Sequence, residues 1–316
     1  MPLNLEQYAK YLDTRGDLFW PAPPEVEPIR ARPHLVRLSS IRLIYWNIYG
    51  TLLAIPLGEL VFEHPQAFIM NNALEKTIQE FKMWASMSRK PGQPADYMIS
   101  QYRQILAENS SSSSGERHPE AQAEKIWETI LKRLMQKDYK FDASFYGSIN
   151  ELSRKVAYFF HASLQGTACY DGAAEAMQHC HNQGIKQGLL ADAQCFTTVQ
   201  LQRGLNQQDP SLRLEEVVAP ERTALSCEVR GKKPSERLFR KALDLAREQG
   251  VAPNEILHVG SQIVRDLVPA KRLGMHTALF VGDRASAKAT PEQLKDPATR
   301  PDVLLTHLPQ LVEVVG

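Results

Sequence analysis

Cysteine is scarce in this sequence, and an excess of charge of one sign is absent. Among 316 residues there are four cysteines, and no two of them form a CxxC pair. A disulfide framework or a zinc ribbon is therefore not indicated. Lysine and arginine together number 37, and aspartate and glutamate together number 36, so the net charge is +1. This balance gives no electrostatic argument for binding nucleic acid or an anionic membrane surface.

Long hydrophobic runs are lacking as well. No apolar stretch approaches the roughly 18–20 residues that cross a bilayer. The first residues, MPLNLEQYAK, lack the basic and then apolar order of a secretory signal. We therefore expect a cytoplasmic protein with neither nucleic acid nor membrane among its partners, and the sequence indicates no particular protein partner. The length favours two domains, each large enough to bury its own core.

Two segments stand apart from the rest of the chain by their composition and spacing. Residues 1–35 are rich in proline around WPAPPEVEPIRARP. Because proline fixes φ and removes a backbone donor, this N-terminal extension is predicted to be extended and to lie over a domain surface. Residues 58–165 are predicted to form an all-helical insert, since apolar residues recur there at helical spacing, as in Leu74, Ile78, Phe81 and Trp84.

The remainder, residues 36–57 and 166–316, alternates short β-prone runs with helices. The runs are IRLIYW at 41–46, Lys186–Leu190, Val217–Val218, ILHVG at 256–260, TALFV at 277–281 and Val303–Leu305. This alternation predicts an α/β core with a doubly wound parallel sheet. In such a sheet ligands bind beyond the carboxyl ends of the strands, so a site is expected just after Trp46, Leu190 and Val259.

Those three strand ends and one lysine carry recognisable motifs. They are NIYGTLL (47–53), LLADAQ (189–194), GKKPSERLF (231–239) and VGSQIVRDLVPAKRLGM (259–275). In this order they resemble the four motifs of the haloacid dehalogenase-like (HAD) hydrolases. The helical insert lies between the first two motifs, where that family has its helical cap. The resemblance covers roughly residues 40–285 and implies a Rossmann-like core interrupted by a cap.

The resemblance implies a role for each matched position, and some of the residues present depart from it. Asn47 stands at the position of the family's nucleophilic aspartate, and its uncharged amide is a poor nucleophile. Tyr49 matches the tyrosine of the dehalogenase-type members. Ala191 replaces the serine or threonine that holds the transferred group, and Lys233 matches the family's lysine.

The fourth motif, which binds Mg²⁺ in the family's phosphatases, is depleted too. Ser261 and Gln262 occupy the position of the first acidic ligand, and only Asp266 remains as a weak metal candidate. One carboxylate and one lysine, Lys233, sum to a charge near zero, which is a poor cage for a divalent cation. We therefore expect no Mg²⁺ and no other cofactor.

A small anionic ligand remains a candidate for this cleft. Gly50 and Thr51 follow the first strand, and their backbone N–H groups together with Lys233 are candidate donors to it. The alternative is that the glycine serves the turn alone.

We interpret the chain as a catalytically impaired HAD-like homologue that keeps a cleft between cap and core for a small ligand or a partner. One alternative is an active dehalogenase-like or phosphatase-like hydrolase whose nucleophile has been changed to Asn47. Two others are a different chemistry in the same pocket and a scaffold with no small ligand. The substitutions at 47, 191 and 261–262 affect separate motifs, which favours natural loss over a single engineered change.

Three further features have simpler explanations. Cys195 follows the second motif, where Lys233 could activate its thiol, but a packed apolar role is the preferred interpretation. His258 within ILHVG is expected to be a core histidine rather than a base. In the HCH triplet at 179–181 neighbouring side chains point about 100° apart on a helix, so a solvated helix end is expected rather than a metal site.

Overall fold

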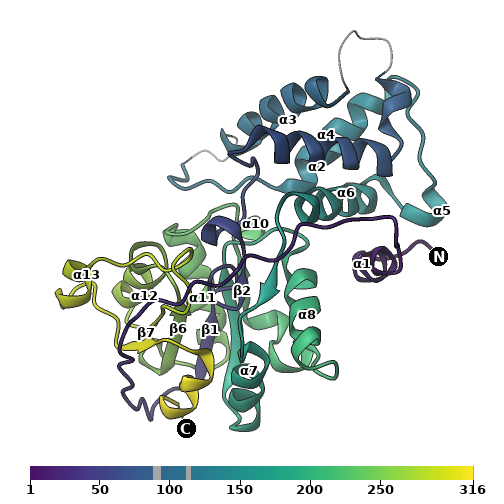
Figure 1. Ribbon diagram of the computed structural model, residues 1–316. Helices are drawn as coiled ribbons and strands as arrows, with labels where there is room; N and C mark the ends of the chain where they lie inside the picture. The colour runs from purple at the N-terminus through teal and green to yellow at the C-terminus, as the bar shows by residue number, and fades with distance from the viewer. Residues whose placement is uncertain (88–93, 112–114, 316) are drawn as a thin grey trace.

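The computed structural model describes residues 1–87, 94–111 and 115–315. At its centre is a six-stranded sheet in the order β5-β4-β1-β6-β7-β8, with every neighbouring pair parallel (Figure 1). Its strands are β1 (Leu43–Trp46), β4 (Lys186–Ala191), β5 (Thr223–Leu225), β6 (Ile256–Gly260), β7 (His276–Phe280) and β8 (Val303–Leu305). A separate antiparallel pair consists of β2 (Leu53–Ala54) and β3 (Ala168–Cys169). The predicted α/β fold with a parallel sheet is confirmed.

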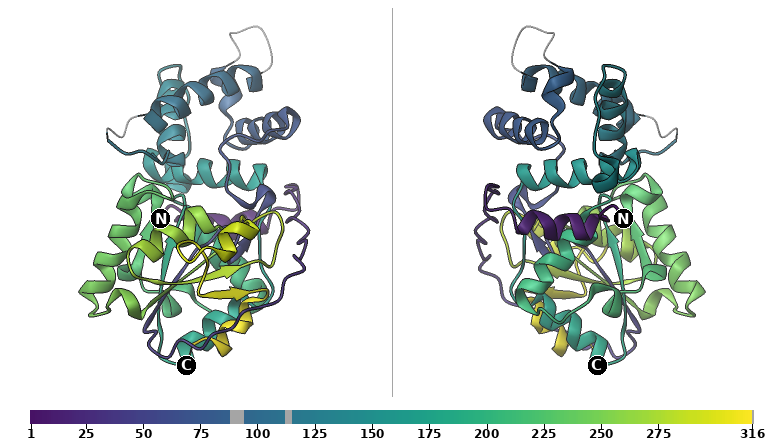
Figure 2. Two further views of the ribbon diagram at one scale, coloured as in Figure 1. Left: turned by 90° about the vertical axis from the view of Figure 1, so that its left-hand side faces the viewer. Right: turned by 90° about the vertical axis from the view of Figure 1, so that its right-hand side faces the viewer.

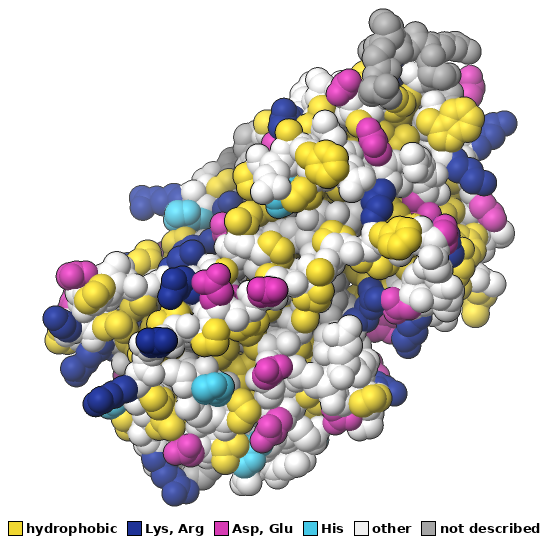
Figure 3. All heavy atoms as spheres, in the orientation of Figure 1, with side chains coloured by type: hydrophobic (Ala, Val, Ile, Leu, Met, Phe, Trp, Pro, Cys, Tyr) yellow, Lys and Arg dark blue, Asp and Glu magenta, His cyan; other side chains and the backbone are white. Residues whose placement is uncertain are grey.

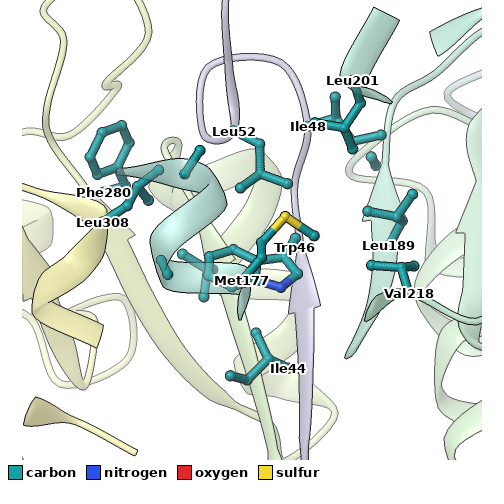
Figure 4. Packing of buried hydrophobic residues seen from close by; sticks show 14 of the residues in the cluster. Ile44, Trp46, Ile48, Leu52, Met177, Leu189, Leu201, Val218, Phe280 and Leu308 are labelled. Atoms are coloured by element: carbon teal, nitrogen blue, oxygen red, sulfur yellow. The ribbon is translucent and has the colours of Figure 1, made fainter. Parts of the chain in front are cut away.

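Helices cover both faces of the sheet, as a doubly wound fold requires. Alternate side chains of the central strand β1 enter different cores: Ile44 and Trp46 one, Leu43 and Tyr45 the other. The first core includes α7 (Ala173–Asn182), α8 (Thr197–Gln208) and η6 (Leu308–Glu313). The second includes α11 (Glu236–Glu248) and α12 (Val268–Arg272). Figure 4 shows the packing of the first core around β1.

A further hydrophobic core belongs to the helices inserted between β2 and β3. These are α2 (Ala67–Glu80), α3 (Pro94–Ser111), α4 (Ala123–Met135), α5 (Ala143–Tyr146) and α6 (Ile149–Leu164). They lie together in the upper part of Figure 1 and bury residues such as Leu74, Trp127 and Phe160. The described part of the segment contains these helices, and the division of the chain into domains with bounds at 58 and 165 stays a prediction. Trp84 leaves the predicted stripe because Lys82 adopts φ 52° after α2, and the Trp84 side chain is exposed.

The predicted extended conformation of residues 1–35 is wrong for the first of them. Helix α1 (Leu5–Asp13) begins with a capping box in which Asn4 and Gln7 exchange side-chain to backbone hydrogen bonds. Its buried face, made of Tyr8, Ala9 and Leu12, packs into the core of the inserted helices. Amphipathic spacing and this cap outweigh the proline-rich composition, because the prolines lie further along the chain.

The proline-rich remainder of the N-terminal segment crosses from the inserted helices to the sheet. Residues 18–33 have no regular secondary structure, and His34 then forms an antiparallel bridge with Leu304 of the edge strand β8. Near its start, Trp20 packs edge-on against Phe159 of α6, with ring centroids 5.2 Å apart. Figures 1 and 2 show the segment running along the outside of the molecule. It therefore ties the two parts together.

One prediction between the second and third motifs is corrected. Val217 ends the short helix α9 (Leu214–Val217), and the edge strand β5 begins later, at Thr223, which pairs with Leu189 of β4. A short buried apolar run does not by itself distinguish strand from helix. Further along the chain, Pro234 follows a cis peptide bond and lies just before α11, which begins at Glu236.

The remaining elements are short and lie in the connections. They are α10 (Ser226–Val229), α13 (Pro291–Lys295), the single turns η1 (Pro56–Gly58), η2 (Met83–Ser86), η3 (Pro220–Arg222) and η4 (Pro253–Glu255), and the π-turn η5 (Ile263–Leu267). On the face drawn in Figure 3, basic and acidic side chains are interspersed. Among the described helices, none has the length and hydropathy that a bilayer-crossing segment needs.

Candidate functional site

The strand ends that carry the motifs meet at one edge of the sheet. Asn47 follows β1, Ala191 ends β4 and Ser261 follows β6, and these three strands are parallel neighbours. The loop between α10 and α11 brings Lys233 to the same edge. The structure therefore gathers the residues predicted from the sequence where α/β folds bind ligands.

The ammonium of Lys233 is the centre of this site and is buried. Its Nζ donates to Asn47 Oδ1 at 3.1 Å and to Asp266 Oδ1 at 2.9 Å, and it lies 3.3 Å from His258 Nε2. A lysine ammonium has three N–H donors and no acceptor. Each donor of Lys233 therefore has an acceptor supplied by the protein itself.

His258 is the residue of this network whose importance the sequence did not reveal. Its Nδ1 lies 3.0 Å from the backbone oxygen of Tyr45, so we assign the ring proton to Nδ1 and leave Nε2 to accept from Lys233. Burial, together with the charge of Lys233, lowers the pKa of His258 to about 3. The imidazole is thus neutral and buried in the core, as expected, and it is also a hydrogen-bond acceptor for Lys233.

Both oxygens of the Asp266 carboxylate are engaged. Oδ1 accepts from Lys233, and Oδ2 accepts from the backbone N–H groups of Ser261 at 3.0 Å and Gln262 at 2.9 Å. Burial alone would raise the pKa of Asp266, but the charge and hydrogen bond of Lys233 and the backbone donor of Gln262 outweigh it and hold that pKa below its ordinary value. Asp266 is therefore ionised at neutral pH and paired with Lys233.

The amide of Asn47 is held on every side. Oδ1 accepts from Lys233, while Nδ2 donates to the backbone oxygen of Tyr49 at 2.9 Å and to Thr51 Oγ1 at 3.3 Å. The side chain thus makes hydrogen bonds through both of its polar atoms, and it carries no charge. It offers the site no nucleophile.

The backbone donors expected to receive an anion are used within the turn after β1. Gly50, at φ 78°, donates its N–H to Leu53 at 2.7 Å, and Thr51 donates its N–H to Ile48 at 3.1 Å. A side chain at Gly50 would also approach Ser261 Oγ to 2.9 Å. The glycine is therefore required by the turn and by close packing, and neither N–H group is directed to a ligand.

Tyr49 and Ala191 both lie in the predicted neighbourhood and are buried. The hydroxyl of Tyr49 donates to Gln200 Oε1 at 2.5 Å and lies 2.9 Å from Thr197 Oγ1, both on α8. Burial raises the pKa of Tyr49 above its usual range. Ala191 is buried in the apolar core and has no hydroxyl with which to hold a transferred group.

A magnesium ion does not fit the residues present here. Asp266 is the remaining carboxylate of the fourth motif, and its two oxygens already accept from Lys233 and from two backbone amides. Over the part of the chain that the structure describes, no three histidine, cysteine, aspartate or glutamate side chains are grouped as metal ligands. A divalent cation would have to displace the Lys233 ammonium to reach an oxygen of Asp266.

Next to Asn47 lies a cavity of about 90 Å³, which is small against the roughly 300–1,000 Å³ of typical ligand pockets. Its charged lining comes from both the core and the insert: Glu59, Glu120, Asp192, Asp266, Lys232 and Arg265. Arg265 bridges Glu59 and Asp192, with an oxygen of each at 2.6 Å. Carboxylates outnumber basic groups on this lining, so it gives no electrostatic preference for an anion.

Two of these residues were not found from the sequence. Arg265 stands directly before Asp266 within the fourth motif, and this position could have marked it as a candidate site residue. Glu120 comes from the loop before α4 and reaches the cavity from the insert, with no motif to mark it. Burial, reinforced by the charge of Asp192, raises the pKa of Glu120 to about 7.

The remaining candidates behave as packed or surface residues. Cys195 packs against the core of the inserted helices, and burial raises the pKa of its thiol well above the ordinary value, which is the reverse of activation. At the end of α7, Cys180 is buried between the more exposed His179 and His181, so the triplet does not converge on one point.

Known proteins are similar to this chain in sequence and in fold. A haloacid dehalogenase-like hydrolase domain-containing protein 3 of Xenopus laevis is 29% identical over 126 residues, which are 40% of this chain and 46% of that protein. A glyceraldehyde 3-phosphate phosphatase of Pyrococcus furiosus is 30% identical over 145 residues, 46% of this chain and 53% of that protein. The chain thus spans about half the length of these relatives. No family model matches it.

The fold comparison extends over most of the molecule. The structure of a 2-haloacid dehalogenase from Pseudomonas syringae is similar with a TM-score of 0.51 and 14% identity, covering 86% of this chain and 97% of the other. The chain is thus similar in sequence and in fold to haloacid dehalogenase-like hydrolases. Within this HAD-like protein the four motifs are present in order, and three of them lack residues that the resemblance assigns to chemistry.

Proposed function

We propose that this HAD-like protein does not hydrolyse phosphate esters or haloacids and that its site is a closed, charge-neutral network instead. The observation that carries the proposal is the saturation of Lys233 by Asn47, His258 and Asp266. A substrate anion would have to displace at least one of these three acceptors. It would gain no nucleophile in return, because the first position carries an amide.

The charge balance of the network supports the same conclusion. Lys233 and Asp266 form a buried ion pair at 2.9 Å, with side chains 1% and 4% exposed. Removing one partner of such a pair costs several kcal/mol, because the other is left as an uncompensated buried charge. A metal ion or a charged substrate that separated the two groups would meet this cost. We therefore propose that the protein works without Mg²⁺.

A protein that does not turn over a substrate can still bind a small ligand or a partner, and we propose that this protein does so. The cavity beside Asn47 is enclosed jointly by residues of the core, such as Arg265, and of the insert side, such as Phe62 and Glu120. Its 90 Å³ admit a few water molecules or a very small ligand. We propose that the protein serves as a non-hydrolytic binder or interaction protein whose fold holds the insert against the core.

Turnover by the purified chain tests this proposal. Release of phosphate from p-nitrophenyl phosphate and glyceraldehyde 3-phosphate, and of halide from 2-chloropropionate, is measured with and without Mg²⁺. The expected result is release no faster than from the Lys233→Ala variant, which lacks the central ammonium. Release well above that variant with any of these substrates would contradict the proposal.

A further inference from the structure

Residues 116–123, which we name the latch segment, join the insert to the loop that carries Lys233. The backbone N–H of Lys232 donates to His118 at 2.8 Å, and Glu120 donates its own N–H to Arg230 at 3.3 Å. Between these two bonds, Pro119 and Gly231 form an antiparallel bridge. The latch segment therefore pairs with residues 230–235, which we name the lysine loop, much as a short strand would.

Side chains reinforce this backbone pairing at both ends. Ser235 Oγ donates to Glu116 Oε2 at 2.8 Å, and Gln122 Nε2 donates to the backbone oxygen of Cys227 at 3.0 Å. Opening the insert would break all of these bonds together.

A second element of the core holds the C-terminal end of the latch segment. Gln194, after β4, uses both ends of its amide: Nε2 donates to the backbone oxygen of Ala121, and Oε1 accepts from the N–H of Ala123, each at 2.9 Å. Gln194 is itself buried. The insert is thus attached to two separate motif loops of the site.

Glu120 is the one titratable side chain of the latch segment that is buried in this contact. It is 6% exposed, and its Oε2 accepts from Ser226 Oγ at 2.7 Å. The charged groups that face it are Asp192 after β4, Lys232 in the lysine loop and Arg265 in η5. The charge of Glu120 also helps to raise the pKa of the Cys227 thiol in α10. Asp192 opposes ionisation of Glu120, whereas Lys232 and Arg265 favour it.

We propose that the latch segment is a proton-sensitive device that holds the insert on the lysine loop while Glu120 is protonated and loosens as Glu120 ionises. The inference goes beyond the proposed function, since it concerns motion of the insert and not turnover. In the closed form a neutral Glu120 sits beside Asp192 without repulsion. In the open form water solvates its carboxylate, so ionisation favours opening.

The sign and size of the effect follow from linkage. Burial, with a contribution from Asp192, raises the pKa of Glu120 from 4.5 to about 7 in the closed form. A raised pKa means that the stabilisation of the closed form is complete below about pH 4.5 and is lost as the pH rises through 7. Between about pH 6 and about pH 8 the open-to-closed ratio is then expected to rise about tenfold.

Hydrogen–deuterium exchange of the full chain measures this opening in peptides covering 116–123 and 226–235. After correction for the intrinsic pH dependence of exchange, we expect about tenfold less protection at about pH 8 than at about pH 6. Glu120→Gln, which keeps the shape of the protonated acid, should abolish that difference. Equal corrected protection of the wild-type chain at the two pH values would overturn the proposal.

Glu116→Gln is the matched control. Glu116 lies in the same segment and accepts from Ser235, but hydrogen bonds to His118 and Ser235 outweigh burial and keep its pKa low, so it does not titrate in this range. This variant should keep the tenfold difference.

If Glu120→Gln disturbs folding, Ser226→Ala serves instead. Losing the hydroxyl that stabilises the Glu120 carboxylate should move the midpoint of opening to higher pH. An unmoved midpoint in a folded Ser226→Ala chain would also count against Glu120.

Discussion

The uncharged amide of Asn47 lies beside the buried ammonium of Lys233 at the centre of this site. Asn47 presents its oxygen to Lys233 and its nitrogen to the turn after β1, so each polar atom of the side chain is satisfied. His258 supplies a third, neutral acceptor. Because buried polar groups are costly when unpaired, this complete pairing is what allows an uncharged residue to persist beside a buried ammonium.

Lys233 is expected to be a major contributor to stability. Lys233→Met would leave the carboxylate of Asp266 buried without its counter-ion, and we expect the free energy of unfolding to fall by about 3–5 kcal/mol in a denaturant titration near neutral pH. The neighbouring Lys232 is exposed and is the matched control. Lys232→Met should change the free energy of unfolding by less than about 0.5 kcal/mol.

The loss in Lys233→Met should depend on pH in a defined direction. The pKa of Asp266 is lowered in the folded wild-type chain, so the ion pair's contribution is present above the ordinary aspartate pKa of 3.8 and is lost as the pH falls through the lower folded value. The gap in unfolding free energy between wild type and variant should therefore narrow as the pH is lowered below 3.8. Equal stability of the two proteins at neutral pH would contradict the buried pair.

At this scale the sequence predicted positions better than contacts. It marked Asn47, Lys233 and Asp266, because each lies in a motif at a strand end. It offered Gly50 and Thr51 as candidate donors to a ligand, with a turn as the alternative for the glycine, and their N–H groups are used by the turn. It did not connect His258 with Lys233, because that contact depends on the side-chain arrangement between β6 and the lysine loop.

Among the elements, the N-terminal helix α1 differs most from expectation. Its capping residues and the spacing of its buried face were visible in the sequence, but the prolines after it dominated the interpretation of residues 1–35. The helices of the insert were recognised from their periodicity. The edge strand β5 was placed too early in the sequence, because the short apolar run at the end of α9 resembles a strand.

Docking of α1 is tested at Tyr8, which is fully buried and whose hydroxyl has no hydrogen-bond partner among the described residues. Tyr8→Ala should lower the free energy of unfolding by about 3–5 kcal/mol, as expected for a large side chain removed from a core. Tyr8→Phe should leave stability unchanged or slightly higher, because it removes a buried polar atom without a partner.

The exposed Phe19, in the same segment, provides the comparison for Tyr8. Phe19→Ala should be nearly neutral in the same denaturant titration, since its ring lies in solvent. If Tyr8→Ala changed the free energy of unfolding as little as Phe19→Ala, α1 would not be packed against the insert as described.

Over the whole molecule, the order of motifs and the alternation of strands and helices were enough to predict the architecture. What could not be predicted is how the two parts are joined. The latch segment contacts the core and residues 18–33 run between the two parts, and neither join has a local sequence pattern. Such joins depend on tertiary pairing of segments distant in sequence, so Glu120 and its partner Ser226 emerged only from the structure.

The most direct test of the central claim is phosphate release by the Asn47→Asp variant in the presence of Mg²⁺. Restoring the carboxylate alone supplies a nucleophile, but Ala191 still lacks a hydroxyl, Ser261 and Gln262 still lack a metal ligand, and Asp266 remains paired with Lys233. We therefore predict phosphate release indistinguishable from that of the wild-type chain, with a known phosphatase of the superfamily confirming the assay. Robust Mg²⁺-dependent turnover by this single variant would contradict the account.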